Sequence, residues 1–236
     1  MITRKGRSRF GMYGALLFAF SSAACSGPLS TLEPAGPASA SIAELWWVML
    51  AGGSALFALV MALLLFGFLR PGAGKDVRPR TWLAGGGLLL PLAVLVPLMV
   101  YAIFSGERLL AHPDARNIVR INVIAELTGW RFSYPDHVGE AQSQNLLYLP
   151  VGRPVDLIVT STDVIHSFWI PRLGGKIDAI PGHKNTIRLS ASQAGTYRGV
   201  CAEFCGPPHT TMNFVAEVVT QADFDVRMRD LAGKPK

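Results

Sequence analysis

Two cysteines, a histidine and a methionine lie close together near the end of the chain, in the sequence CAEFCGPPHTTM. They are Cys201, Cys205, His209 and Met212. Two cysteines this close can form a disulfide outside the cytoplasm, but a disulfide leaves the histidine and the methionine unexplained. Zinc is bound by thiolates and imidazoles, and its usual ligands do not include a thioether. Thiolate, imidazole and thioether together are typical of copper held for electron transfer.

The number of cysteines indicates two copper ions. A common single-copper electron-transfer site has one cysteine, whereas two thiolates can bridge two ions if each ion also has a histidine. His166, at the end of a predicted strand in STDVIHSFWIP, is the best candidate for the second histidine, and His183 is a weaker one. A lone histidine in such an apolar setting is also commonly a core residue. Because Gly-Pro-Pro at 206–208 cannot continue a helix, we expect a loop that turns both thiolates toward one centre.

Two long uncharged segments predict membrane helices. Residues 45–69 and 82–104 contain no charged side chain, and a helix needs about 20 residues to cross the hydrocarbon core. Prolines within the second segment should bend it. The loop between the segments has four basic residues and one acidic residue, an excess that marks the cytoplasmic side. We therefore expect a two-pass protein of a bacterial-type inner (plasma) membrane, with residues 106–236 as a domain in the periplasm.

The first 25 residues have the pattern of a signal peptide or lipoprotein leader, with a basic start, a short apolar stretch and small residues before Cys25. Cys25 is the candidate lipid anchor, and cleavage nearby or an uncleaved anchor are the alternatives. Residues 26–41, rich in Pro, Ala and Ser, predict a flexible leader to the first helix. The net charge is +6, but its excess lies in residues 1–105 and reflects membrane topology, so we expect no nucleic-acid partner.

Residues 106–236 predict an all-β domain. Apolar and polar residues alternate at a period of two in INVIAEL, as in a half-buried strand. The predicted strands are 121–127, 130–134, 154–161, 165–170, 185–190, 196–200 and 214–219, and one helix is predicted at 222–231. So many short strands in one domain favour a Greek-key sandwich or barrel.

The segments TSTDVIHSFWIPRLGGKIDAIPGH and GTYRGVCAEFCGPPHTTMNF resemble subunit II of the haem–copper cytochrome c oxidases. The resemblance covers the leader, the two-helix transmembrane hairpin, an aromatic stretch and a cupredoxin-like domain. It implies a dinuclear copper A centre with six ligands: Cys201 and Cys205 bridging both ions, His166 and Met212 on one ion, and His209 and the backbone carbonyl of Glu203 on the other. It also implies that the Glu203 carboxylate faces a magnesium site shared with subunit I.

The same resemblance implies where electrons enter and leave. Trp130, in WRFSY, matches the aromatic stretch W-x-W-S-Y at which family members accept electrons from cytochrome c, and core packing is the alternative role. Asp136, Glu140 and Asp163 would attract the basic face of cytochrome c. Electrons would then pass to a haem in subunit I, where oxygen is reduced and protons are translocated. The expected partners are subunits I and III, cytochrome c and membrane lipid, and the chain alone would have no oxidase activity.

One departure from the family and three competing functions bear on this interpretation. Residues 81–91 contain no acid, where the family often has a glutamate at the mouth of a proton pathway, so we expect subunit I or Asp76 to supply that group. The matching subunit of a quinol oxidase lacks the copper ligands. A nitrous oxide reductase domain needs a large catalytic domain for which no residues remain. A membrane-tethered copper carrier does not require two bridging thiolates beside an aromatic strand.

Overall fold

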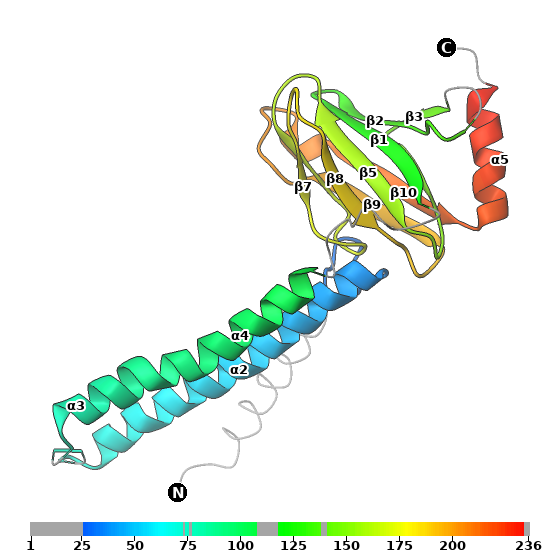
Figure 1. Ribbon diagram of the computed structural model, residues 1–236. Coiled ribbons are helices and arrows are strands. Elements are labelled where there is room, and N and C mark those ends of the chain that lie inside the picture. Colours follow the sequence, from blue (N-terminus) through cyan, green and yellow to red (C-terminus); the bar gives the residue numbers. More distant parts are fainter. Residues whose placement is uncertain (1–25, 73, 76, 108–117, 138–140, 234–236) are drawn as a thin grey trace, which may run out of the picture. The chain divides into compact units, whose positions relative to one another are not determined.

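The structure is a computed structural model that describes residues 26–233 except 73, 76, 108–117 and 138–140 (Figure 1). It divides into two units: Ser41–Leu110, which contains the apolar helices, and a β-sheet domain to which residues 26–40 belong. The predictions for the leader with Cys25, for Asp76 and for Glu140 fall outside the described residues.

Two apolar helical stretches confirm the predicted pair of membrane helices. Helix α2 covers Pro37–Leu69, and a second stretch, Pro79–Glu107, consists of α3 (Pro79–Thr81), the π-helix η2 (Trp82–Leu89) and α4 (Leu90–Glu107). Both stretches have a mean hydropathy of 2.4 and are long enough to cross a membrane. Helix α2 begins earlier than predicted because proline is tolerated in the first turn of a helix.

The second helical stretch changes register just before Pro91. A proline has no N–H to donate, so the carbonyl four residues earlier lacks its usual partner. The π-helix lies directly before this point, and the N–H of Leu90 donates to the carbonyl of Gly85, five residues back. The sequence predicts a bend caused by the prolines, and the structure shows a widened helical turn there.

Two five-stranded sheets form the β-sheet domain, which confirms the predicted all-β sandwich. The first sheet has the order β3 (Gln142–Gln144), β2 (Gly129–Ser133), β1 (Val119–Glu126), β5 (Val155–Ser161) and β8 (Asn185–Leu189). The second has the order β4 (Leu146–Pro150), β10 (Asn213–Val219), β9 (Gly195–Cys201), β6 (His166–Trp169) and β7 (Ile177–Ala179). Neighbouring strands are antiparallel except for the pairs β1–β5 and β4–β10, which are parallel.

Aromatic rings from both sheets fill the core. Trp130 and Phe132 lie on the same face of β2, because side chains two residues apart point the same way, and they meet Phe168 from β6 and Phe214 from β10. Phe168 and Phe214 stack at 4.8 Å between ring centroids. Trp130 lies 5.5 Å from Phe168 and 5.4 Å from Phe214. The rings thus join the two sheets next to the chain segments that carry the predicted metal ligands.

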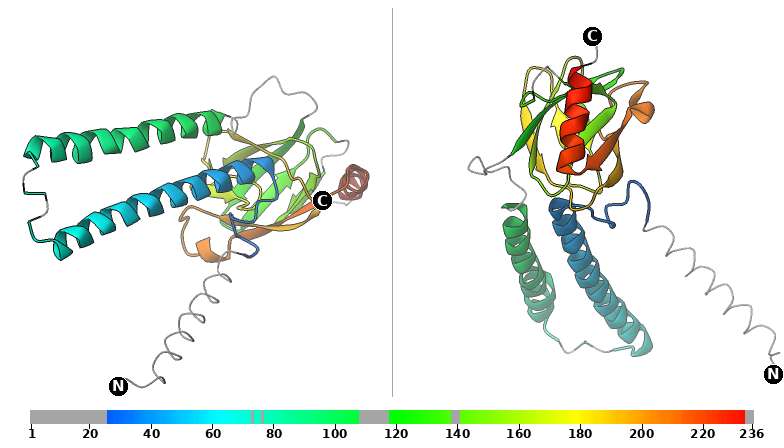
Figure 2. Two further views of the ribbon diagram at one scale, coloured as in Figure 1. Left: turned by 90° about the horizontal axis from the view of Figure 1, so that it is seen from below. Right: turned by 90° about the vertical axis from the view of Figure 1, so that its right-hand side faces the viewer.

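The strands β3, β4 and β7 are additions to the sequence prediction. Strand β4 is a continuous apolar run without alternation, and most of its residues are buried. Helix α5 (Gln221–Ala232) lies along the outside of the β-sheet domain (Figure 2), and Arg227 from this helix lies 5.7 Å from the centre of the Tyr148 ring on β4. A strand covered on both faces does not show the period-two pattern, so the pattern could not reveal it.

The segment that the sequence predicts to be a flexible leader packs on the β-sheet domain. The amide of Ala35 donates to the carbonyl of Arg172 at 2.7 Å, and the amide of Ser192 donates to the carbonyl of Ala35 at 2.7 Å. The Ser39 hydroxyl donates to the same Arg172 carbonyl at 2.7 Å. Ala35 and Ser39 are both buried. These hydrogen bonds make the segment part of the domain.

Candidate metal centre

Three neighbouring strands of the second sheet bring the predicted ligands together. His166 is the first residue of β6, Cys201 is the last residue of β9, and Met212 directly precedes β10. Strand β9 lies between β6 and β10, and the amide of Cys201 donates to the carbonyl of Met212 at 3.1 Å. The turn between Cys201 and Met212 carries Cys205 and ends in a 3₁₀ turn, η3 (His209–Thr211). The expected loop is therefore confirmed.

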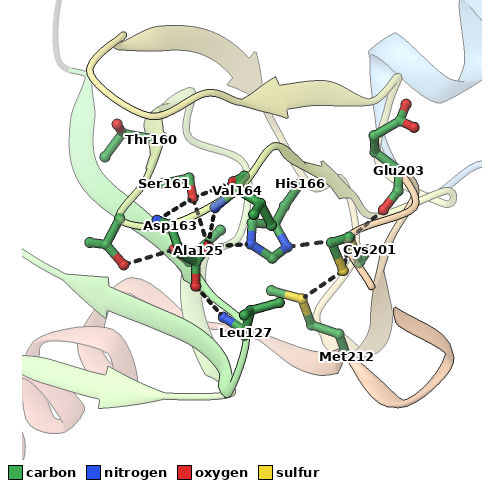
Figure 3. Close-up of polar contacts among 12 residues, drawn as sticks. Ala125, Leu127, Thr160, Ser161, Asp163, Val164, His166, Cys201, Glu203 and Met212 are labelled. Carbon is green, nitrogen blue, oxygen red and sulfur yellow. Dashed lines mark hydrogen bonds and ion pairs between the residues drawn. The ribbon is translucent and has the colours of Figure 1, made fainter. Parts of the chain in front are cut away.

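The side-chain donor atoms lie close together, and Figure 3 shows those of His166, Cys201 and Met212 turned toward one another. The sulfurs of Cys201 and Cys205 lie 3.8 Å apart, and the Met212 sulfur lies 3.8 Å from that of Cys205. Nδ1 of His166 lies 3.9 Å from the Cys201 sulfur, and Nδ1 of His209 lies 3.8 Å from the Cys205 sulfur. Cys201, Cys205, Met212 and His166 are all buried. The structure thus brings both predicted histidines to the two thiols.

The two cysteines are free thiols in this structure. A disulfide requires a sulfur–sulfur distance of about 2.05 Å, far shorter than the 3.8 Å between Cys201 and Cys205. The observed separation is less than twice a metal–thiolate bond of about 2.3 Å, the length found in zinc sites. An ion beside the line that joins the two sulfurs can therefore bind both of them. A second ion can bind both sulfurs from the opposite side of that line.

Glu203 presents two different groups. Its backbone carbonyl faces the centre, 3.2 Å from the Cys201 sulfur, whereas its carboxylate points away from the sulfurs (Figure 3) and accepts a hydrogen bond from the Phe204 amide at 3.1 Å. Among the described residues, the only group of three or more His, Cys, Asp and Glu side chains that could hold a metal is His166, Cys201 and Cys205. A magnesium ion at the Glu203 carboxylate would thus need further ligands from outside this group.

The surroundings of Cys205 favour its neutral thiol. Burial, followed by the neighbouring Cys201 thiol, raises the pKa of Cys205 to about 11. A bound cation reverses this effect because it favours the thiolate, so metal binding releases protons from the site.

The carboxylate of Asp163 holds the other side of the His166 ring. Nε2 of His166 lies 2.8 Å from Oδ1 of Asp163, while the amide of Leu127 donates to Oδ2 at 2.7 Å. Burial raises the pKa of Asp163, but hydrogen bonds from His166, the Leu127 and Val164 amides and Ser161 outweigh burial and lower the pKa to about 2. Asp163, which the sequence predicts to attract a partner, uses both carboxylate oxygens in these internal contacts.

Trp130 is fully buried beside the centre. Its indole is 0% exposed, its Nε1–H donates to the Met212 carbonyl at 3.5 Å, and its ring lies edge-on to His166 with centroids 6.2 Å apart. Its role as the residue where electrons enter stays a prediction. A donor protein would contact the residues that cover the ring and not the ring itself.

Asn145 fixes the backbone of Trp130, a role that is not among the predictions from the sequence. Its side-chain oxygen accepts a hydrogen bond from the Trp130 amide at 2.8 Å, and its own amide donates to the Trp130 carbonyl at 2.8 Å. It is the only residue other than glycine in the described part of the chain with a positive φ, 54°. Asparagine tolerates this conformation better than most residues, but one asparagine between two strands is too common a signal to identify it.

The described contacts of the two thiols with other side chains involve His166 and His209 and not the weaker candidate, His183. His183 is exposed in a turn where its amide donates to the carbonyl of Ile180 at 3.2 Å. The structure therefore favours His166 over His183 as the second imidazole.

Comparison with known proteins finds one family. Residues 130–219 match the model of the family described as cytochrome C oxidase subunit II, periplasmic domain. The chain is 34% identical over 165 residues to cytochrome c oxidase subunit 2 of Alkalihalophilus pseudofirmus, covering 68% of this chain and 47% of that protein. It is 30% identical over 223 residues to the probable cytochrome c oxidase subunit 2 of Rickettsia prowazekii, covering 83% of this chain and 70% of that protein. The chain thus spans about half the length of the first of these relatives.

The chain is also similar to part of a solved structure. The periplasmic domain of subunit II of cytochrome oxidase of Bradyrhizobium japonicum is 30% identical, with a TM-score of 0.47, and the match covers 50% of this chain and 95% of that one.

Proposed function

Because the chain belongs to the cytochrome c oxidase subunit II family, we propose that it is the subunit through which electrons enter a terminal haem–copper oxidase. It would receive electrons from cytochrome c and pass them to a haem in subunit I, where oxygen is reduced and protons are translocated. The observation that carries this proposal is the convergence of two thiols, two imidazoles, a thioether and a backbone carbonyl at one end of the β-sheet domain.

The donor set fits a dinuclear copper A centre. Two copper ions, when bound, would supply a one-electron site whose charge is shared between both ions. The six groups that would hold them are the thiolates of Cys201 and Cys205 as bridges, His166 and Met212 on one ion, and His209 and the Glu203 carbonyl on the other. Thiolate and thioether sulfur favour copper among the common metals, and a zinc site would leave Met212 without a role.

The protein keeps these donors in place. Met212 and both cysteines are at most 7% exposed, and the strands β6, β9 and β10 that carry them are joined by backbone hydrogen bonds. Ligands that move little between oxidation states favour rapid electron transfer. The contact of Trp130 with the Met212 carbonyl supports a path from the surface above the indole to the centre.

We also propose how the chain contacts other subunits and the membrane. The Glu203 carboxylate would bind magnesium together with residues of subunit I, and subunit III would be a further neighbour. The apolar helices would anchor the chain in the inner membrane with the β-sheet domain in the periplasm, and Cys25 would carry a lipid.

Metal analysis of the full chain, purified in detergent and loaded with copper under reducing conditions, tests the copper proposal. We expect two copper ions per chain and a purple mixed-valence spectrum. Cys205→Ser should abolish the spectrum. His183→Asn is the matched control for loss of a histidine and should leave the spectrum unchanged. A disulfide between Cys201 and Cys205 that persists under these conditions, or a single bound ion, would contradict the proposal.

The donor is tested separately in the intact oxidase complex. Turnover should be supported by reduced cytochrome c and not by a quinol in the absence of cytochrome c. The opposite preference would assign the chain to a quinol oxidase.

A further inference from the structure

A short loop sets the position of His166. Strand β5 ends at Ser161 and β6 begins at His166, so the loop of residues 162–165 leads directly into the histidine at the start of the second sheet's strand. The amide of Thr162 donates to the carbonyl of Ala125, at the end of β1, at 3.2 Å. The loop is thus tied to the neighbouring strand near its start.

The Asp163 carboxylate makes most of the hydrogen bonds that hold this loop (Figure 3). Oδ1 accepts hydrogen bonds from the Val164 amide at 2.6 Å and the Ser161 hydroxyl at 3.1 Å, and it lies 2.8 Å from Nε2 of His166. Oδ2 accepts from the amide of Leu127, in the turn that follows β1, at 2.7 Å. One carboxylate therefore connects two loops of the first sheet to a residue of the second sheet.

These contacts select one form of the His166 ring. A carboxylate only accepts hydrogen bonds, so the proton of the neutral imidazole belongs on Nε2. The lone pair then lies on Nδ1, the atom that faces the Cys201 sulfur at 3.9 Å. A metal requires a nitrogen lone pair, and a carboxylate on the far side of the ring fixes the tautomer and raises the electron density of the ligand.

The second imidazole has no such support. Nδ1 of His209 faces the Cys205 sulfur at 3.8 Å, and its ring contacts Phe204 with centroids 5.8 Å apart. Within the described residues, no protein hydrogen bond reaches Nε2 of His209. The two imidazoles at this centre are thus held differently: His166 by a carboxylate and His209 by an aromatic contact.

We propose that Asp163 is a positioning residue for a copper ligand. It holds His166 with Nδ1 toward the thiolates, and its negative charge makes the metal position served by His166 the more electron-rich of the two. This inference rests on the proposed function, because it concerns the copper that His166 would bind.

The test compares copper binding in full-length Asp163→Asn and wild-type protein in detergent. Asparagine has nearly the same shape, and its amide oxygen can still accept from Nε2, but it lacks the charge. We expect a 10- to 100-fold loss of copper affinity, the usual effect of removing such a partner, measured by titration against a competing chelator. The reduction potential of the bound copper should rise, because a nearby negative charge stabilises the oxidised state, and the visible bands should shift.

Asp136→Asn is the matched control. It removes the same charge from the same domain, at the opposite end of β1, where Oδ2 of Asp136 accepts from the Arg120 amide at 3.1 Å. Its potential and spectrum should equal those of the wild type. An Asp163→Asn protein that matches the wild type in affinity, potential and spectrum would overturn the inference, as would equal shifts in both variants.

Ser161→Ala decides the case if Asp163→Asn fails to fold. It removes the hydroxyl that donates to Oδ1 of Asp163 and to the Val164 carbonyl and accepts from the Asp163 amide, and it leaves the charge and the contact with His166 in place. We expect a smaller loss of affinity, below about 10-fold, and an unchanged affinity would overturn the inference. Wild-type protein that binds no copper would instead overturn the proposed function, and the inference with it.

Discussion

Gly199, in the middle of β9, lies directly under the ring of Phe214, and a methyl group there would test the packing next to the metal ligands. A Cβ atom at this position would be 2.1 Å from Cζ of Phe214, whereas carbon atoms in contact are about 3.5 Å apart or more. The Phe214 ring would have to move by more than an ångström. Phe214 follows Met212 by two residues, so a movement of the Phe214 ring would also shift the predicted metal ligands.

The size of the stability loss in Gly199→Ala follows from the side chains that surround the Phe214 ring. Phe168 stacks on Phe214 at 4.8 Å, Trp130 and Phe132 lie at 5.4 and 5.5 Å, and Phe214 is buried, so three aromatic neighbours restrict the movement of the ring. Overpacking of this kind costs about 1–3 kcal/mol, here near the upper limit. Replacing a glycine restricts the unfolded chain and offsets about 0.4–1 kcal/mol. The net expectation for Gly199→Ala is a loss of about 2 kcal/mol, or roughly 5–10 °C in the melting temperature of a domain this size.

Near-UV circular dichroism during heating reports this change, because it follows aromatic packing in the β-sheet domain. Gly233→Ala is the control: its φ is −84° and the nearest atom to an added Cβ is 3.6 Å away, so its melting temperature should be unchanged. Phe214→Leu should relieve the clash, so the double variant should lose less stability than the sum of the single variants. An unchanged melting temperature in Gly199→Ala, or strictly additive losses, would refute this reasoning.

Substitutions at three further positions should change the stability of the β-sheet domain in predictable ways. Because the pKa of Asp163 is lowered from 3.8 to about 2, its stabilising contribution is present above pH 4 and is lost as the pH falls to about 2. The difference in melting temperature between wild type and Asp163→Asn should therefore disappear over that range, and a difference that persists at pH 2 would contradict the assignment. Asn145→Ala should cost about 1–3 kcal/mol, since it leaves the buried Trp130 amide without its acceptor and keeps a positive φ. Asn145→Gly should cost less because glycine adopts that φ freely, and the reverse order in chemical denaturation would show that φ is not a source of strain. Thr220→Ala should cost about 1 kcal/mol, because the Thr220 hydroxyl accepts from the amide of Asp223 at the start of α5, and an unchanged denaturation midpoint would argue against this cap.

The alternation of apolar and polar residues predicted most of the strands, and the length of the uncharged segments predicted both apolar helices. The strand at 121–127 and the helix at 222–231 correspond closely to β1 (Val119–Glu126) and α5 (Gln221–Ala232), because each has one buried and one exposed face. Strand β4 was missed because it is buried on both sides. The leader was misjudged because its backbone hydrogen bonds go to Arg172 and Ser192, and composition does not report such partners.

The sequence predicted the metal-binding residues of the candidate centre. It did not predict the residues that hold them in position. The spacing of Cys201, Cys205, His209 and Met212 identified the donors without knowledge of the fold. The role of Asp163 depends on how a loop folds back toward Leu127, which residue types alone do not determine. The burial of Trp130 was readable in principle, since it alternates with the exposed Arg131 on β2, but burial does not show which neighbours it touches.

The hydrogen bonds between Ala35 and both Arg172 and Ser192 carry a consequence for membrane sidedness. They join residues that precede the first apolar helix to residues that follow the second. Segments that touch must lie in the same aqueous compartment, so the intervening chain crosses the bilayer an even number of times. Two crossings satisfy this parity, so the hydrogen bonds of Ala35 place both flanking segments on one side of the membrane without any appeal to the charges of the connecting loop.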